Sequence, residues 1–507
     1  MNEPSFISRY TLTSLDCVRN FGVLINTGIF LAILFASNPV LAHGFAYKYD
    51  LPLPLNLYVF GSSSIVFVSF LMLLFWRKGT KELLDLKLSY TFKNPNFYKI
   101  QRMAEATLGT LSIMLSTIIL CAGFFGNSNT LSNPLPVTIW VLWWVGFFYF
   151  TALCVNIWNS INPWAFSFQL AEVAIGKRIQ LTSYPTWLGY WPSFMFFLSF
   201  VWIELVWPHK EVPATLATVI TLYTLITWTG MTIYGKQSWL KYGECFSVIF
   251  TLIGNFSPIQ FCKTKKTLHI QPPALGILKM QEPSMGLVFI TILLLAGLSF
   301  DGFMATKNWL QLKTYLLNIN TLHSIFRELH QTFGSLQPIL TTLGLASTLL
   351  LFLFTYIFIS FLTKVLINWT STPPKLKVSL PKIVKHFVMT LLPIAIGYHI
   401  AHYLSYLLLA GQLIIPLASD PYALGWDLFN TNDYRIDIGI INAKNMWGIT
   451  LVSVIIGHIL SMFLSHVRAS QLCLSTNRIL IQLPLVTLMI LYTGVSLWIL
   501  AQPIVEL

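Results

Sequence analysis

The chain of 507 residues is built from long apolar runs, most of them close to 20 residues, that alternate with short polar stretches. About 20 consecutive apolar residues are what a helix needs to cross the hydrocarbon core of a bilayer. The pattern therefore predicts an all-α fold, a polytopic bundle of about 11 transmembrane helices. The runs lie at about 21–41, 55–76, 104–126, 136–157, 187–207, 214–234, 284–304, 338–363, 386–411, 443–467 and 479–502.

Two further apolar stretches, at 164–175 and 243–256, are too short to cross a bilayer and are bounded by basic residues or proline. Stretches of this length lie in the membrane interface or re-enter the membrane more often than they span it. We therefore expect two interfacial helices beside the spans.

The first run supports two interpretations. Basic residues precede it, and Val40-Leu41-Ala42 fits a secretory cleavage site. Residues 1–42 are then either a signal-like segment, which leaves 10 spans, or the first transmembrane anchor. In both cases residues 43–507 form a single polytopic membrane domain. If cleavage follows Ala42, His43 becomes an N-terminal residue whose amine and imidazole chelate copper.

The composition supports a membrane protein. Hydrophobic residues make up 55% of the chain and charged residues only 10%, where soluble domains carry about a quarter charged residues. The net charge of +13 does not indicate nucleic acid, because the basic residues recur between spans instead of gathering in one domain. If the N-terminus is cytoplasmic, 24 of the 31 lysines and arginines fall in inner segments. This asymmetry follows the positive-inside rule and predicts an inner-membrane-type protein with a cytoplasmic N-terminus.

Three histidines lie where ionisable side chains are costly. His399 and His402 share the run 386–411, and His458 lies at a similar depth in the next run. Residues three and seven apart share a helix face, so His399, His402 and Tyr406 form one polar stripe. We expect the three histidines to meet near mid-membrane, where they bind Zn, Cu, Fe or haem, or relay protons. The alternative is ordinary hydrogen bonding between helices.

Two carboxylates lie about one turn inside the predicted outer boundary. Glu204 precedes Trp207 and Pro208, and Asp301 has a similar depth in another run. Carboxylates and imidazoles that converge on a water-facing pocket suit acid–base chemistry or a divalent metal. We therefore expect Glu204 and Asp301 to be catalytic groups in the outer half of the bilayer. The alternative is a hydrogen bond from each to a neighbouring helix.

Further polar residues lie in the predicted outer segments. His43 is a candidate metal ligand, and Asp50, Asp420 and Asp427 are candidate site residues. For the loop aspartates, turns and helix caps are the favoured explanation. Familiar enzyme motifs are absent from the sequence: it has no Walker A, GxGxxG, HExxH, GxSxG or CxxCH.

Several segments, in order over nearly the whole chain, resemble a group of bacterial multi-pass membrane proteins labelled fenitrothion hydrolase. They are 43–54, Trp202-Ile203-Glu204, 243–248, Ser299-Phe300-Asp301-Gly302, 398–403, Gly411-Gln412, Ser419-Asp420-Pro421, 425–429 and 492–503. One mild departure is Asn430, where a glycine is usual. The resemblance implies hydrolysis of an organophosphate triester, an apolar substrate that arrives from the lipid. It assigns no catalytic residue.

Three hypotheses follow. The first is a metal-dependent membrane hydrolase of organophosphate-type esters, and the second a haem- or metal-binding redox or metal-handling protein. The third is a transporter that uses the same polar stripe as a pathway. Each has membrane lipid as a partner and none involves nucleic acid, and the sequence leaves the oligomeric state open. Elemental analysis and an absorbance spectrum of detergent-purified protein separate the first two from the third.

Overall fold

The computed structural model describes residues 54–74, 87–92, 96–262, 267–370, 378–472 and 478–502. The predicted segment 1–42, with the span at 21–41, lies outside the described residues, as do the candidate residues His43 and Asp50.

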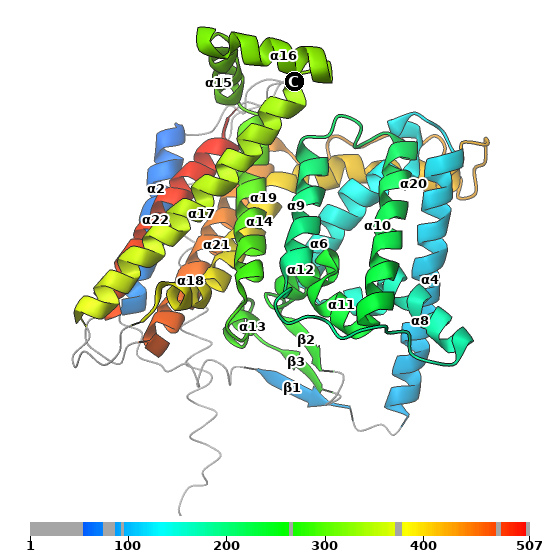
Figure 1. The fold of residues 1–507 in the computed structure, drawn as a ribbon, viewed down its shortest axis with the longest axis horizontal. Coiled ribbons are helices and arrows are strands. Elements are labelled where there is room, and N and C mark those ends of the chain that lie inside the picture. The colour runs from blue at the N-terminus through cyan, green and yellow to red at the C-terminus, as the bar shows by residue number, and fades with distance from the viewer. Residues whose placement is uncertain are drawn as a thin grey trace, which may run out of the picture.

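Long apolar helices dominate the described chain (Figure 1). Nine of its helical stretches are long and apolar enough to cross a membrane, which confirms a helical, multi-pass architecture. They are α2 (Leu55–Leu74), α4 (Phe97–Phe125), α5-η2-α6 (Pro134–Pro136, Val137–Phe147 and Phe148–Leu153), α10 (Pro213–Tyr234), α14 (Met285–Met304), α17 (Gln337–Thr370), α18-η4-α19-η5-α20 (Leu380–Val388, Met389–Leu391, Leu392–Ala410, Gly411–Leu413 and Ile414–Ser419), α21 (Ala443–Leu472) and α22 (Arg478–Leu500).

The predicted span at 187–207 is a shorter helix, α9 (Trp191–Leu205), of 15 residues. At 1.5 Å per residue it is about 22 Å long, against about 30 Å for the hydrocarbon core. Proline at its start and a turn after Leu205 limit its length. Short segments connect the longer helices: η1 (Thr130–Ser132), α7 (Trp158–Ile161), α11 (Lys236–Tyr242), α13 (Leu275–Leu278), α15 (Lys307–Leu317), η3 (Asn320–Leu322) and α16 (His323–Phe333).

Both short apolar stretches are helical. The first forms α8 (Pro163–Ile175), which begins at the Asn162 cap and ends at Gly176 in the left-handed conformation. The second forms α12 (Cys245–Gly254), and here the interfacial prediction is wrong: nine of its ten residues are buried inside the protein. The side chain of Glu244 caps its first turn through the amides of Phe246 and Ser247. An apolar face all round a helix indicates burial within a bundle.

A small sheet closes one end of the bundle and was not expected from the sequence. Strand β3 (Thr267–Ile270) lies between β1 (Leu88–Thr91) and β2 (Ile259–Cys262), antiparallel to both, with Ser89 and Gln260 opposite His269. Four-residue strands within polar loops leave no clear alternation to recognise. The sheet joins two loops that the charge pattern had assigned to the same side of the membrane.

The helices form two groups that meet at α14 and α19 (Figure 1). Helices α2, α17, α21 and α22 pack together on one side, and α4, α8, α9, α10, α11 and α12 on the other. Helix α14 contacts α9 and α17, and therefore joins the two groups. Helices α15 and α16 lie at the end of the bundle opposite the sheet.

Helices α19 and α21 cross at two glycines. Each glycine faces backbone of the other helix: Gly397 faces the carbonyl of Ser453, and an added Cβ at Gly457 would lie 2.6 Å from the carbonyl oxygen of Pro393. Small residues let transmembrane helices approach this closely. The 3₁₀ segment η4 lies just before α19, and Pro393 lies in the first turn of α19.

This crossing predicts different costs for two alanines on the same helix. Gly457→Ala is expected to destabilise the fold by roughly 1–3 kcal/mol, as overpacking does, because the methyl group would meet the Pro393 carbonyl. Gly448, also on α21, has nothing within 4 Å of an added Cβ. Gly448→Ala is therefore expected to be neutral or to stabilise the helix by up to about 1 kcal/mol. The apparent melting temperatures of the two variants in detergent measure these effects. Equal shifts in melting temperature would contradict the close crossing of α19 and α21.

Candidate functional site

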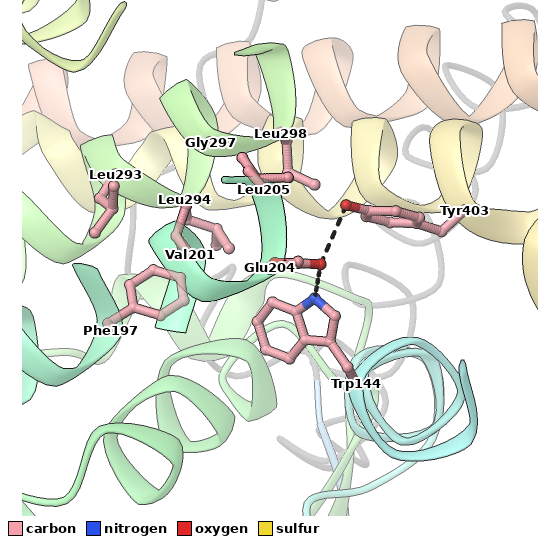
Figure 2. Close-up of a pocket in the computed structure, with 10 residues that line it drawn as sticks. All are labelled: Trp144, Phe197, Val201, Glu204, Leu205, Leu293, Leu294, Gly297, Leu298 and Tyr403. Carbon is pink, nitrogen blue, oxygen red and sulfur yellow. Dashed lines mark hydrogen bonds between the residues drawn. The ribbon is translucent and has the colours of Figure 1, made fainter. Parts of the chain in front are cut away.

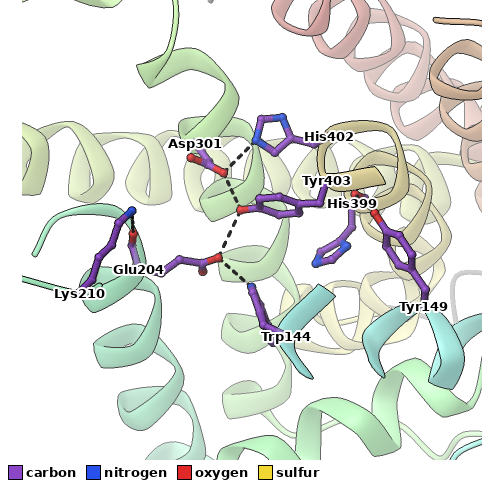
Figure 3. Close-up of polar contacts among 8 residues, drawn as sticks. All are labelled: Trp144, Tyr149, Glu204, Lys210, Asp301, His399, His402 and Tyr403. Carbon is purple, nitrogen blue, oxygen red and sulfur yellow. Dashed lines mark hydrogen bonds and ion pairs between the residues drawn. The ribbon is translucent and has the colours of Figure 1, made fainter. Parts of the chain in front are cut away.

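Two of the predicted catalytic residues meet at one tyrosine (Figure 3). The Tyr403 hydroxyl donates a hydrogen bond to Asp301 Oδ2 at 2.5 Å and lies 3.3 Å from Glu204 Oε1. His402 Nε2 is 2.9 Å from the same Asp301 oxygen. The residues predicted from separate spans, Glu204, Asp301 and His402, thus form one hydrogen-bonded group around a residue that the sequence had not singled out.

Three helices supply this group. Glu204 lies in the last turn of α9, and Asp301 lies one turn before the end of α14. His402 and Tyr403 are neighbours on α19, so their side chains leave the helix about 100° apart and reach Asp301 from two directions. The helix ends that carry Glu204 and Asp301 are those farther from the sheet. In the topology expected from charge, these ends are the ones predicted to lie in the outer half of the bilayer.

Two further contacts hold Glu204 in place. Trp144 Nε1 donates a hydrogen bond to Glu204 Oε1 at 2.8 Å, and Lys210 Nζ donates one to the Glu204 backbone oxygen at 2.6 Å. Trp144 belongs to the π-helix η2, a wide helical form that often marks functional sites. Lys210 satisfies a carbonyl at the end of α9 and brings a positive charge near the two carboxylates.

The number of protons limits this hydrogen bonding. A tyrosine hydroxyl has one proton to donate, and an ionised carboxylate only accepts. The proton of Tyr403 therefore serves Asp301 or Glu204, but not both at once. One additional proton on a carboxyl group would complete the chain from Glu204 through Tyr403 to Asp301. The group therefore offers a defined place for an exchangeable proton.

A small cavity adjoins Glu204 (Figure 2). Its wall is mostly apolar side chains of α9 and α14, and its polar groups are those of Trp144, Glu204 and Tyr403. It has about 10 Å³ of room for the centre of a water molecule, which is about what one water requires. Its lining is almost wholly apolar, because Trp144 Nε1 already donates to Glu204 and the Tyr403 hydroxyl to Asp301.

His399 lies one turn from Tyr403 but outside this group. Its ring is fully buried and stacks on Phe148 with centroids 3.8 Å apart and an angle of 4°. Tyr149 donates its hydrogen bond to the His399 backbone oxygen, not to the ring. Neither ring nitrogen has a hydrogen-bond partner among the described residues. A buried polar group left without a partner is costly, so this ring is itself a candidate functional group.

His458 faces a different part of the bundle. Its Nδ1 is 2.9 Å from the Val454 backbone oxygen, and its ring lies 5.8 Å from that of Tyr492 on α22. The expected meeting of His399, His402 and His458 is therefore wrong for the described chain. The reason is the rotation of the helices: α19 and α21 meet at Gly397 and Gly457, and the histidines point elsewhere. Tyr406, the third member of the predicted stripe, is 40% exposed.

The donor set does not fit a metal or haem. Nowhere in the described ranges do three His, Cys, Asp or Glu side chains gather as a metal site requires. The Tyr403 hydroxyl occupies the position between the two carboxylates. Phe148 covers one face of the His399 ring at van der Waals distance, and leaves no space there for a porphyrin. We therefore derive no chemistry from a metal at these residues.

The loop aspartates bind backbone amides of their own loop, as the favoured explanation predicted. Asp420 accepts hydrogen bonds from the amides of Leu424 and Gly425 at 2.8 and 2.7 Å. Asp427 accepts one from the amide of Thr431 at 2.8 Å. Asn430, where related sequences were expected to have glycine, has a φ of 55°. Asparagine tolerates this left-handed conformation better than most residues.

Three other residues around Glu204 and Asp301 have only weak signals in the sequence: Trp144, Lys210 and Tyr403. Trp144 sits in a tryptophan-rich run that reads as an ordinary span, and Lys210 as an ordinary outer-loop lysine. Tyr403 follows His402 directly and is distinguished in the sequence only as part of the segment 398–403. Comparison with models of known families, with curated proteins and with solved structures gives no match.

The central position of Tyr403 predicts a stability difference between two tyrosines of α19. Tyr403→Phe leaves Asp301 and Glu204 without their shared donor and is expected to cost about 1–3 kcal/mol, as other unmade buried hydrogen bonds do. Tyr406→Phe is the matched control, because Tyr406 lies one turn away and is 40% exposed. Thermal unfolding in detergent would show a lower melting temperature for the first variant only. Equal stability of the two variants would contradict the network.

Proposed function

We propose that this is a proton-coupled membrane transporter in which Glu204, Tyr403, Asp301 and His402 bind and pass a proton. The observation that carries the proposal is the single hydroxyl between two carboxylates, with a histidine on the far side of one of them. Ionisable residues inside a membrane commonly mark proton relays and substrate pathways.

The proposed setting is the bacterial inner membrane, with a cytoplasmic N-terminus and the sheet on the cytoplasmic side. The charge distribution and the sequence resemblance support it. In this orientation the carboxylate group lies toward the outer surface. The side chains of Asp301 and His402 are 19% and 21% exposed, and in the proposed orientation this pair is where a proton from the outer side would enter.

The relay moves one proton with no other change in the group. A proton from the outer side binds the His402–Asp301 pair. Tyr403 gives its hydroxyl proton to Glu204 and takes the proton from Asp301, so that the tyrosine is restored. The net result is one proton transferred from Asp301 to Glu204. Protonated Glu204 no longer repels Asp301 through charge.

Such a change is suited to coupling because each partner sits on a different helix. Glu204 belongs to α9, Asp301 to α14 and Tyr403 to α19, and these helices lie where the two helix groups meet. A proton that alters the contacts among three helices shifts the balance between two arrangements of the bundle. His399 is buried beside Tyr403, and neither of its ring nitrogens has a hydrogen-bond partner within the described part of the chain. It is the next group on this route.

Infrared spectroscopy tests the proton site without knowledge of the substrate. Difference spectra of reconstituted protein between neutral and acidic buffer are expected to show a carboxylic acid C=O band that shifts in D₂O. Glu204→Gln should remove this band. Glu211→Gln, a change in the exposed loop after α9, should leave it intact. A wild-type spectrum with no such band, or a band unchanged in Glu204→Gln, would count against the proposal.

A second candidate is a membrane hydrolase, which the water-sized cavity beside Glu204 favours along with the sequence resemblance. Glu204 would take a proton from a water as its oxygen forms a bond to phosphorus. The bond from phosphorus to the leaving oxygen would break, and that oxygen would receive the proton.

This candidate predicts phosphotriester cleavage by the purified protein, with or without added divalent metal. The rate is expected to fall at least about 100-fold in Glu204→Gln, the lower range for loss of a general base, and to persist in Glu211→Gln. Wild-type protein that cleaves no phosphotriester would remove the hydrolase and leave the proton site untouched.

A further inference from the structure

The loop between α20 and α21 presents an unusual number of apolar side chains outside any helix. Within residues 420–440, here called the apolar loop, Leu424, Leu428 and Phe429 are each more than 60% exposed. Trp426, Ile438 and Ile440 are between 43% and 51% exposed. An exposed apolar surface of this kind on an ordered loop indicates contact with a partner or a membrane.

The backbone of the apolar loop finds its hydrogen bonds within the protein. Besides the amides bound by Asp420 and Asp427, the Phe429 amide donates to Ser419 Oγ at 2.8 Å. The Asp437 amide donates to Gln412 Oε1 at 2.8 Å, and the Gly439 amide to Asp437 Oδ1 at 2.8 Å. A loop in water does not need this many side-chain acceptors. A loop in an environment with little water does, because each unsatisfied amide there is costly.

The position of the loop indicates which environment this is. The Tyr422 hydroxyl lies 3.4 Å from the Ile118 backbone oxygen on α4, and Figure 1 shows the loop beside the end of α4 that is farther from the sheet. Ile118 is seven residues before the end of α4, a depth of about 10 Å along the helix. The α4 surface there is exposed and apolar at Leu111, Leu115 and Ile118.

We propose that the apolar loop is immersed in the interfacial layer of the lipid bilayer, on the side opposite the sheet. Lipid covers the loop, because the exposed apolar surface of the loop continues that of the spanning helix α4. Tyr422, Trp426 and Tyr434 supply the amphipathic rings that favour this layer. Asp420 and Asp427 then serve to satisfy backbone amides where water is scarce. This proposal is independent of the proton site.

Nitroxide labels in reconstituted full-length protein test the depth of the loop. A label at Leu428→Cys, with the native cysteines replaced by serine, is compared with a label at Ile118→Cys in the spanning region and one at Glu211→Cys in the exposed polar loop after α9. The expected result is several-fold higher collision with oxygen, which concentrates in lipid, than with a water-soluble nickel complex at Leu428 and Ile118. The label at Glu211 should show the reverse preference.

Two results would overturn the proposal. Preference of the Leu428 label for the nickel complex would place the loop in water. Low collision with both reagents would mean that protein covers it, from a second copy, a partner or residues 1–53. If the serine background does not fold, a photoactivatable phospholipid added to wild-type vesicles gives a second measurement. Adducts on peptides from 424–440 are expected, and their absence beside adducts on α4 would reject immersion.

Discussion

Hydrocarbon offers no hydrogen bonds, so a polar group that this protein places in it is costly unless it finds a partner within the chain. The constraint accounts for the long helices, which satisfy their own backbone. It accounts equally for the polar side chains between them. Glu204, Asp301 and His402 occur on helices that are otherwise apolar, and they are found together because apart they would each be a buried charge or donor without a partner.

Tyr403 connects these polar side chains to the proposed proton relay. Its hydroxyl lies within reach of two carboxylates and has one proton for both. A group of this kind is complete only when an extra proton is bound, so its hydrogen bonding depends on protonation. Because the three acidic and hydroxyl partners come from α9, α14 and α19, a change in protonation is also a change in the contacts between helices.

The same constraint separates two uses of aspartate in this chain. Asp301 sits inside the bundle and bonds to side chains of another helix. Asp420 and Asp427 bond to amides of their own loop and to a serine next to it. From the sequence all three were candidates for one site. The structure assigns the first to the buried group and the other two to the shape of a loop whose apolar side chains point outward.

The sequence by itself determined the helical multi-pass class, the approximate limits of ten described helices and the positions of Glu204 and Asp301 near the ends of their helices. These follow from local properties, since the transfer of a 20-residue apolar run into lipid depends on that run alone. Only the tertiary structure decided that Tyr403 joins the carboxylates, that His399 and His458 point away from each other, and that α12 is buried. These depend on the rotation of each helix about its axis. That rotation is set by contacts such as Gly397 with Ser453 and Gly457 with Pro393, between segments some 60 residues apart, which no local pattern records.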